Sequence, residues 1–285
     1  MTQILQKGCV LITGAGGRLG RLLQAARSDT LDLHHRFLFQ SKGDHADLCW
    51  SPNDSLDHLP RCDAIIALWG ATSGGEEDLA QNAHLVSLSA DLARGLGATR
   101  VIHMSSAAVY GPGQEMKEDH PTGDCNLYGK SKLAMESEID LDRQKSDLTH
   151  IALRLANVVG ADSLAPVLRG ERPAKIDDFS AGPDHQGPIR SYIGAKGLLQ
   201  ILDALCTLPA TAWPKILNVA APLPVSMDAL ALAAGQPVLW QPAPQTAVPV
   251  VTLDVSLLQT LLPDIKLAET AAELIAEWRR LERLA

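Results

Sequence analysis

The chain has 285 residues, of which 46% are hydrophobic and 20% charged, so it can bury a substantial core, and a disordered or fibrous chain is excluded. Its 25 Lys and Arg against 33 Asp and Glu give a net charge of -8, and because the acidic residues are scattered, a nucleic-acid partner is not expected. No apolar run approaches the ~20 residues of a membrane span and the N-terminus lacks the order of a signal peptide, so we expect a soluble, cytoplasmic protein with no membrane contact.

The first half of the chain alternates short apolar runs with longer amphipathic segments. This alternation predicts β-α-β units around a doubly wound parallel sheet, which is an α/β fold. In chain order, the expected elements are a strand at Cys9–Thr13, a helix beginning at Leu19–Ala26, strands at Arg36–Gln40 and Ala64–Leu68, a helix at Leu79–Leu96 that stops at Gly95 and Gly97, a strand at Arg100–Met104, a helix at Leu127–Asp142 and a strand at Ile151–Asn157.

The sequence changes character from about Gly160 onward, because thirteen of the 17 prolines lie there and divide it into short pieces. We expect a first domain over residues 1–160, with return elements from about 188–220, and a small α/β lobe over residues 161–285, with a binding cleft between the two. The expected elements of this part are helices at Ala195–Thr207, Met227–Ala234 with Ser226 as N-cap, and Ala268–Leu284, and strands at Ile216–Val219 and Val238–Trp240.

A glycine-rich turn follows the first strand. Gly14, Gly17 and Gly20 stand three residues apart between that strand and the next helix. Glycine allows a tight turn, a close approach of the chain to a pyrophosphate and close packing of the helix on the strand. The first helical turn, with Arg18 and Leu19, offers unpaired N–H groups and a partial positive charge to phosphates. These five residues therefore predict a dinucleotide site, with a purely structural turn as the alternative.

A tyrosine and a lysine lie four residues apart in the segment YGKSK at 128–132, on a predicted helix. Tyr128 and Lys132 therefore share a face. An ammonium group beside the phenol, together with a cationic nicotinamide above it, favours the phenolate of a side chain whose pKa is ordinarily near ~10. The pair indicates proton transfer, and a solvated helical pair is the alternative. Upstream, Ser105 and Ser106 end a predicted strand at the carboxyl edge of the sheet, where ligands bind in such folds.

The segments TGAGGRLG, SSAAVYG, YGKSK and LRLANVVGA occur in this order. Together they resemble the extended short-chain dehydrogenase/reductases of the NAD-dependent epimerase/dehydratase kind, strongly over residues 8–160 and weakly beyond. The resemblance implies a Rossmann-type NAD(P)-binding domain with a small substrate lobe. It places the family's catalytic serine, tyrosine and lysine on Ser106, Tyr128 and Lys132.

The same resemblance implies further binding residues. Asn82 matches an asparagine of the helix before the serine strand, and Asp47 and Leu48 resemble a pair that flanks the adenine. Asn157 matches an asparagine that approaches the substrate phosphates in sugar-nucleotide members. Arg190, in the segment PIRSYIG, resembles an arginine that often meets a nucleotide diphosphate, and a structural ion pair is its alternative.

One departure from the family pattern concerns the reaction. Members that dehydrate sugars carry an Asp-Glu pair directly after the catalytic hydroxyl, and here Ala107 and Ala108 occupy those places. A dehydratase is therefore disfavoured. Epimerases and reductases need no such pair, because the hydride and the tyrosine proton suffice.

A second departure concerns the cofactor. Where an NAD site usually offers a carboxylate to the ribose, at the end of the second strand, the chain has Gln40, Ser41 and Lys42. Ser41 and Lys42, with Arg18 or Arg36 nearby, can donate to a 2′-phosphate. The sequence therefore favours NADP slightly over NAD, with a solvated lysine in a turn as the alternative interpretation.

Neither a metal site nor a disulfide framework is predicted. The nine histidines lack ligand spacing. The cysteines are odd in number and include no C-x-x-C pair, so we expect inert thiols. They are Cys9, Cys49, Cys62, Cys125 and Cys206.

These patterns predict an NAD(P)-dependent oxidoreductase or epimerase. Tyr128 is expected to act as acid and base, Lys132 to lower the pKa of that tyrosine and hold the nicotinamide ribose, and Ser106 to orient the substrate oxygen. The expected substrate is an anionic small molecule, first a nucleotide-linked sugar and second a simpler ketone or aldehyde. A sensor or scaffold that binds NADP(H) without turnover is the alternative. Relatives often dimerise through the helices corresponding to Leu79–Leu96 and Leu127–Asp142, which implies a homodimer.

Overall fold

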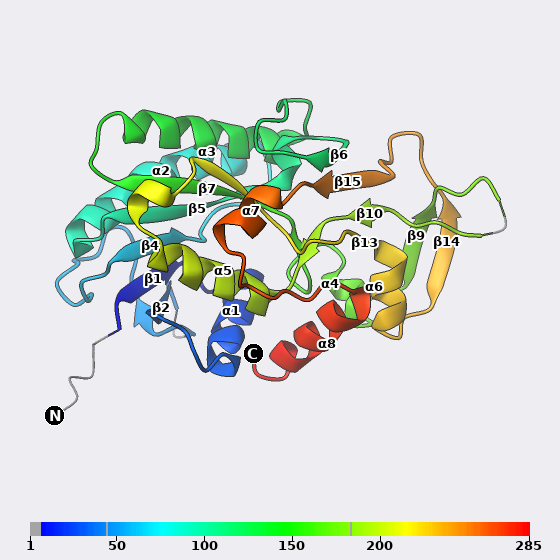
Figure 1. Ribbon diagram of the computed structural model, residues 1–285, viewed down its shortest axis with the longest axis horizontal. Coiled ribbons are helices and arrows are strands. Elements are labelled where there is room, and N and C mark those ends of the chain that lie inside the picture. The colour runs from blue at the N-terminus through cyan, green and yellow to red at the C-terminus, as the bar shows by residue number, and fades with distance from the viewer. Residues whose placement is uncertain (1–6, 44, 183) are drawn as a thin grey trace.

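A seven-stranded sheet forms the centre of the computed structural model, which describes residues 7–43, 45–182 and 184–285 (Figure 1). The strand order is β12-β7-β5-β4-β1-β2-β3, and every adjacent pair is parallel. This confirms the predicted α/β fold. The strands are β1 (Cys9–Thr13), β2 (Arg36–Ser41), β3 (Leu48–Cys49), β4 (Ala64–Ala67), β5 (Arg100–Ser106), β7 (Thr149–Leu155) and β12 (Ile216–Val219).

The central strands are apolar because helices cover both faces of the sheet. In β1, Val10, Leu11 and Ile12 are completely buried, which is typical of parallel strands. Two helices, α2 and α3, pack together on one face, and α1 and α5 pack together on the other (Figure 1). Within the described residues, no helix is both long and apolar enough to cross a membrane. The four helices are α1 (Arg18–Asp29), α2 (Glu76–Leu96), α3 (Leu127–Arg143) and α5 (Ala195–Thr207).

Smaller elements lie beside the carboxyl edge of the large sheet, at the right of Figure 1. One small sheet has the order β13-β10-β15-β6, and two strand pairs join β8 to β11 and β9 to β14. The strands are β6 (Gly113–Met116), β8 (Asn157–Val158), β9 (Ala174–Asp178), β10 (Ile189–Arg190), β11 (Tyr192–Ile193), β13 (Val225–Ser226), β14 (Val238–Pro242) and β15 (Val250–Leu253). The helices are α4 (Ala165–Leu168), α6 (Met227–Ala233), α7 (Ser256–Leu261) and α8 (Ala271–Glu282), with short 3-10 turns at Ala107–Val109 and Ala210–Ala212.

The structure differs from the sequence prediction at several boundaries. The strand expected at Ile151–Asn157 ends at Leu155, and Asn157 begins β8, which pairs with β11 outside the large sheet. Helix α2 continues through Gly95 and ends only at Gly97, whose φ of 73° is readily adopted by glycine. Helix α8 begins three residues later than expected, because a capping box at Thr270 fixes its start. The domain division near residue 160 stays a prediction, and residues 1–6 and Pro183 lie outside the described residues.

Candidate active site

A cleft of about 600 Å³ opens at the carboxyl edge of the large sheet. Parallel strands direct their following loops to this edge, which is where ligands bind in open α/β sheets. Segments far apart in the sequence meet here: the start of α1, the turn after β5, the start of α3, β8 and β10. The predicted site residues that line the cleft are Arg18, Leu19, Ser106, Tyr128, Asn157 and Arg190.

The glycine turn between β1 and α1 is shaped by close backbone packing. Gly14 has a φ of 71°, and a Cβ there would lie 2.6 Å from the backbone of Trp69. A Cβ on Gly20 would lie 2.3 Å from the carbonyl oxygen of Ala15, so this glycine lets the helix approach the turn. A Cβ on Gly17, in contrast, would meet nothing closer than 3.7 Å. Two of the glycines therefore serve packing within the protein, and Gly17 leaves space above the turn.

The N-terminus of α1 carries N–H donors that no side chain among the described residues caps. Gly17 is the N-cap, without a side chain to accept a hydrogen bond, and the first turn contains no acidic residue. The N–H groups of the first helical turn have no carbonyl partner within a helix, and the helix dipole makes this end positive. A dinucleotide pyrophosphate fits this arrangement, because it needs both donors and a close backbone approach.

A side chain at the end of β2 holds the glycine turn in place through a hydrogen bond. Gln40 Oε1 accepts a hydrogen bond from the Gly14 N–H at 3.1 Å, and its Nε2 donates to the carbonyl of Trp50 at 2.5 Å. The hydroxyl of Ser41 donates to the carbonyl of Gly43 at 2.5 Å. Lys42 is exposed. Gln40 and Ser41 thus have partners within the protein, and Lys42 is the exposed cation at this strand end.

The arginines expected beside these residues lie elsewhere. Arg36 begins β2 and pairs with Cys9, so it is separated from Ser41 by the length of the strand, about 17 Å at 3.3 Å per residue. The expectation that Arg36 is near the adenine ribose is therefore wrong. Arg18 Nη1 donates to the carbonyl of Asp162 at 3.4 Å, which directs it toward the cleft.

Asp47 and Leu48 lie beside β2. The Asp47 carboxylate accepts a hydrogen bond from the Phe39 N–H at 2.9 Å and forms an ion pair with Arg27. Leu48 begins β3 and packs on a small apolar cluster at this side of the sheet. Neither lines the large cleft, so their contact with an adenine stays a prediction.

Tyr128 and Lys132 lie on consecutive turns of α3, which begins at Asn126 with a side-chain cap. The Lys132 ammonium lies 5.8 Å from the centre of the Tyr128 ring, is 4% exposed and donates to the carbonyl of Met104 at 2.8 Å. Burial lowers the pKa of Lys132 to about 8, and the charge of Glu136 acts in the opposite direction. The amine is therefore held by the end of β5 beneath the phenol.

The environment of Tyr128 favours the protonated phenol. Burial raises the pKa of Tyr128, and a hydrogen bond with the Ser106 hydroxyl lowers it by a smaller amount. Ser106 itself is fixed, because its Oγ accepts a hydrogen bond from the Ala108 N–H at 3.1 Å. The sequence analysis expected Lys132 to lower the pKa of this tyrosine, but in the structure burial prevails and the direction is upward.

The helix that carries Tyr128 and Lys132 also forms a buried ion pair, between Glu136 and Arg154, that was not predicted from the sequence. Glu136 accepts a hydrogen bond from the Ser105 hydroxyl at 2.5 Å and from the Arg154 guanidinium at 3.1 and 2.8 Å. The three side chains come from α3, β5 and β7, so they tie the helix to the two strands. Glu136 lies one turn after Lys132, and this spacing was the signal in the sequence that would have revealed it.

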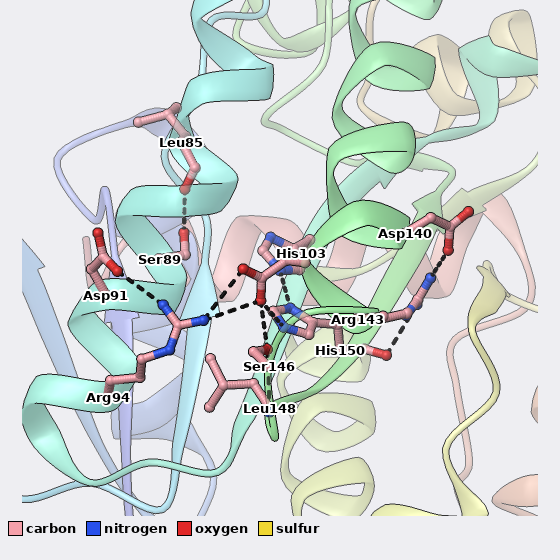
Figure 2. A network of polar contacts seen from close by, with 11 residues as sticks. Leu85, Ser89, Asp91, Arg94, His103, Asp140, Arg143, Ser146, Leu148 and His150 are labelled. Atoms are coloured by element: carbon pink, nitrogen blue, oxygen red, sulfur yellow. Dashed lines mark hydrogen bonds and ion pairs between the residues drawn. The ribbon is translucent and has the colours of Figure 1, made fainter.

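A second polar network ties α2 and α3 to the same strands (Figure 2). His103 Nε2 lies 3.0 Å from His150 Nδ1, and His150 Nε2 lies 3.0 Å from Asp142, which pairs with Arg94 of α2. Burial lowers the pKa of both histidines, so both are neutral near pH 7. The network positions the helices and does not reach the lining of the cleft.

Asn82 has an internal role in the structure. Its amide donates to the carbonyl of Ala71 at 3.0 Å and to the Ser131 hydroxyl at 3.1 Å, and its oxygen accepts from the Ala71 N–H at 2.9 Å. It is 1% exposed and connects the loop after β4 to α3. Asn82 does not line the cleft, and its contact with the cofactor stays a prediction.

The far wall of the cleft carries a cation without a carboxylate partner. Arg190 donates to the carbonyls of Ile189, Val248 and Pro249 at 2.7, 2.7 and 3.1 Å. Burial lowers its pKa. Carbonyl groups do not neutralise the charge, and no ion pair involves Arg190 in the described part of the chain, so this wall carries an uncompensated positive charge. The alternative of a structural ion pair is thereby disfavoured.

Asp162, which the sequence analysis did not select, lines the same cleft. Its Oδ1 is buried and has no hydrogen-bond partner among the described residues. Burial raises the pKa of Asp162 to about 7 from an ordinary value of 3.8. Backbone N–H groups at the start of α4 and the charge of Arg18 lower it by smaller amounts. Nothing in the sequence pattern separates this aspartate from the solvated ones, because its burial depends on the folded cleft.

Because its pKa is raised in the folded chain, Asp162 lowers the free energy of unfolding by an amount that grows with pH. In the folded chain it keeps its proton up to about pH 7, whereas unfolded it loses the proton near pH ~4. The folded state therefore loses stability as the pH rises through this window. We expect Asp162→Asn to raise the Tm relative to wild type at both pH values. The increase at pH 8 should exceed the increase at pH 5 by about 5 °C. Calorimetry at both pH values measures this, and a difference in Tm independent of pH contradicts it.

Comparison with known proteins agrees with this fold. A family model described as the NAD dependent epimerase/dehydratase family matches residues 10–185. A dTDP-6-deoxy-L-talose 4-dehydrogenase (NAD(P)(+)) of Kitasatospora kifunensis is 27% identical over 173 residues, which are 58% of this chain and 52% of that protein. The chain therefore spans about half the length of the curated relative it matches.

Solved structures resemble the whole chain. A UDP-glucose 4-epimerase from Brucella ovis in complex with NAD has a TM-score of 0.79 at 19% identity, over 95% of this chain and 97% of that one. A UDP-glucose-4-epimerase from Stenotrophomonas maltophila with bound NAD and formylated UDP-arabinopyranose has a TM-score of 0.76 at 19% identity. The match covers 97% of this chain and 98% of that one. At this identity the likeness shows a common fold.

Proposed function

Because the chain belongs to the NAD dependent epimerase/dehydratase family, we propose that it is an NAD(P)-dependent oxidoreductase or epimerase that acts on a carbonyl or hydroxyl carbon. The observation that carries this proposal is that Ser106 and Tyr128 line the same cleft as Asn157 and Arg190. Two hydroxyls stand where a proton can be exchanged with a substrate oxygen, and an amide and an uncompensated cation stand where an anionic substrate can be held.

The glycine turn would hold the cofactor. The N–H groups at the start of α1 and the open space above Gly17 suit a pyrophosphate. When bound, NAD(P)+ would supply a hydride acceptor and a positive charge. Lys132 donates to the carbonyl of Met104 and, at 3.9 Å, to the sulfur of Met135. One of its three N–H donors is thus left for the nicotinamide ribose that the family resemblance assigns to it.

NADP is the proposed preference over NAD. None of Gln40, Ser41 and Lys42 at the end of β2 carries a carboxylate that would repel a 2′-phosphate, and Lys42 is exposed there. Since Arg36 lies at the other end of the strand, Lys42 is the main donor in this proposal. Titration of the protein with each dinucleotide tests it. Tighter binding of NADP supports the preference, and equal or tighter binding of NAD rejects it.

Tyr128 exchanges the proton in the proposed mechanism. Its phenol donates a proton to the substrate oxygen when a carbonyl is reduced and takes it back when the alcohol is oxidised. The Ser106 hydroxyl is fixed by the Ala108 N–H and contacts Tyr128, so it lies where it can orient the same oxygen. Burial raises the pKa of Tyr128, so in the free protein the phenol holds the proton that it donates when a carbonyl is reduced.

A nucleotide-linked sugar is the proposed substrate. Arg190 and Arg18 supply positive charge to the lining of the cleft, and Asn157 supplies an amide. This suits a diphosphate, and the similar proteins include enzymes named for dTDP and UDP sugars. Ala107 and Ala108 also line the cleft and offer no acid or base for a dehydration. A simpler ketone or aldehyde is the second candidate.

The proposed activity is tested with a panel of UDP and dTDP sugars and simple carbonyls, each with NAD or NADP. Absorbance of the reduced nicotinamide reports net oxidation or reduction. Product analysis must accompany it, because an epimerase regenerates its cofactor internally. Conversion of a nucleotide sugar supports the proposal. Conversion of simple carbonyls alone rejects the proposed substrate class, and cofactor binding without conversion of any compound favours the sensor.

The homodimer through α2 and α3 stays a prediction. Leu127 and Leu141 of α3 are 54% and 44% exposed, which is compatible with an apolar contact on this side of the sheet. Sedimentation of the purified chain decides between monomer and dimer.

A further inference from the structure

Two thiols lie in contact at the amino edge of the large sheet. Cys9 Sγ and Cys62 Sγ are 3.3 Å apart, although the residues are 53 positions apart in the sequence. Cys9 begins β1, and Cys62 precedes β4, the neighbouring parallel strand. Neighbouring strands are ~4.8 Å apart, and disulfides link Cα atoms about 4.4–6.8 Å apart. Val10 pairs with Ala64, so Cys62 lies one residue beyond the position opposite Cys9. With this offset of ~3.3 Å along the strand, the Cα separation is about 6 Å, which is within the range that a disulfide requires.

Backbone hydrogen bonds hold both cysteines in place. The Cys9 N–H donates to the Asp63 carboxylate at 2.7 Å, and the Asp63 N–H donates to the Cys9 carbonyl at 2.7 Å. The Cys62 N–H donates to the carbonyl of Leu96 at 3.1 Å, at the end of α2. Each sulfur is thus fixed by residues that do not belong to the pair, so their proximity follows from the fold.

The two thiols differ in exposure and in acidity. Cys9 is partly exposed, and Cys62 is 4% exposed within an apolar cluster. The hydrogen bond from Cys62 lowers the pKa of Cys9, and the charge of Arg36, which lies opposite Cys9 on β2, acts in the same direction. Burial and the Asp63 carboxylate oppose this. The hydrogen bond to Cys9, together with burial, raises the pKa of Cys62. A partly exposed thiol with a lowered pKa beside a buried thiol is the arrangement of an oxidant-sensitive pair.

We propose that Cys9 and Cys62 are a site of reversible oxidation by hydrogen peroxide, which converts the two thiols to a disulfide between β1 and the segment before β4. The Cys9 thiolate attacks one peroxide oxygen, an S–O bond forms, the O–O bond breaks, and hydroxide leaves to become water. The Cys62 sulfur then attacks the Cys9 sulfenic acid, the S–S bond forms, and the oxygen leaves as a second water. Two thiols are oxidised by two electrons, and one peroxide is reduced to two waters.

The modification is remote from the proposed active site. The thiols lie at the amino edge of the sheet, whereas the cleft lies at the carboxyl edge, one length of β1 away, or about 15 Å. The bond would close a long loop of the chain, and closing such a loop stabilises the folded state. The oxidised protein is therefore expected to melt about 5–10 °C higher than the reduced protein. The proposal does not depend on the proposed enzymatic activity.

The test uses the full chain, first reduced and then treated with hydrogen peroxide near neutral pH. Remaining thiols are alkylated, and the digested protein is analysed by mass spectrometry. The expected result is a cross-linked Cys9–Cys62 peptide, with three of the five cysteines still alkylated. Alkylation of both Cys9 and Cys62 after treatment, or prior oxidation of the exposed Cys49, overturns the proposal. A lower Tm of the oxidised protein also overturns it.

Variants separate the two steps. Cys62→Ser, or Cys62→Ala if the serine variant does not fold, is expected to stop at a sulfenic acid on Cys9 that dimedone traps. Cys9→Ser is expected to leave Cys62 reduced under the same treatment. Cys125→Ser, which changes a thiol outside the pair, is the matched control and should form the cross-link as wild type does. A sulfenic acid on Cys62 in the Cys9 variant would overturn the assigned order of attack.

Discussion

Tyr128→Phe is expected to lower kcat by about 10³-fold or more and to leave the Kd for NAD(P) within about 3-fold of wild type. The substitution removes only the phenolic oxygen, which is the proposed proton carrier. The ring remains, and with it the packing of the ring over Lys132, whose ammonium lies 5.8 Å from the ring centre. Turnover measured under saturating substrate and cofactor, together with a fluorescence titration of the cofactor, separates the two effects.

The matched control for this experiment is Tyr110→Phe. The Tyr110 hydroxyl is buried and donates to Asn218 at 2.7 Å, away from the lining of the cleft. Its loss is expected to cost about 1–3 kcal/mol of stability, with little change in kcat. Substantial turnover by Tyr128→Phe would reject the proposed mechanism. An equal loss of turnover in both variants would show that the effect comes from stability and not from proton transfer.

Gly17→Ala is expected to raise the Kd for the dinucleotide about 10- to 100-fold and to change the Tm by less than about 2 °C. A Cβ at this position meets nothing within 3.7 Å in the free protein. The backbone of Gly17, with φ of -75°, is one that alanine adopts without strain. The added methyl group can therefore interfere only with a molecule that lies against the turn.

Two further glycines serve as references for this prediction. Gly20→Ala would place a Cβ 2.3 Å from the carbonyl of Ala15, so its expected effect is a large loss of stability. Gly182→Ala meets nothing within 4 Å, and no change in stability or cofactor affinity is expected. Calorimetry and cofactor titration of all three variants make the comparison. Wild-type affinity in a folded Gly17→Ala protein would contradict the assignment of the turn as the pyrophosphate site.

The large sheet was predictable from the sequence because its signals are local. The apolar runs at Cys9–Thr13 and Ala64–Ala67 are strands in the structure, and the helix at Ala195–Thr207 has the expected bounds. Such runs are hydrophobic because both faces of a parallel sheet are covered. The short strands of the second part, such as β10 and β13, have two residues each. They carry no periodic pattern, because periodicity needs several turns or alternations to appear.

The site residues were predictable only where a motif fixes them. Ser106 and Tyr128 were found by their motifs and line the cleft, although their catalytic roles stay predictions. Asp162 was not found, because its raised pKa comes from burial between segments that meet only in the folded chain. Arg36 was misplaced for a related reason: nearness in the sequence to Ser41 does not bring it near in space, since a strand separates the two residues.

Contacts between segments that are distant in the sequence were the hardest features to predict from the sequence. The Cys9–Cys62 contact depends on the neighbouring positions of β1 and β4, which the sequence order alone does not fix. The buried pair of Glu136 and Arg154 joins α3 to β7 in the same way. Both contacts follow from the order of strands in the sheet and from the register of their residues.

The central claim is that the phenol of Tyr128, the amine of Lys132 and the hydroxyl of Ser106 surround the reacting carbon of a dinucleotide and its substrate. A crystal structure of the chain with NADP+ or NAD+ and a nucleotide sugar measures this most directly. We expect the pyrophosphate at the N-terminus of α1, and the reactive carbon of the nicotinamide facing a substrate oxygen within hydrogen-bonding distance of Tyr128. A dinucleotide bound elsewhere, or a Tyr128 hydroxyl many ångströms from the nicotinamide, would contradict it.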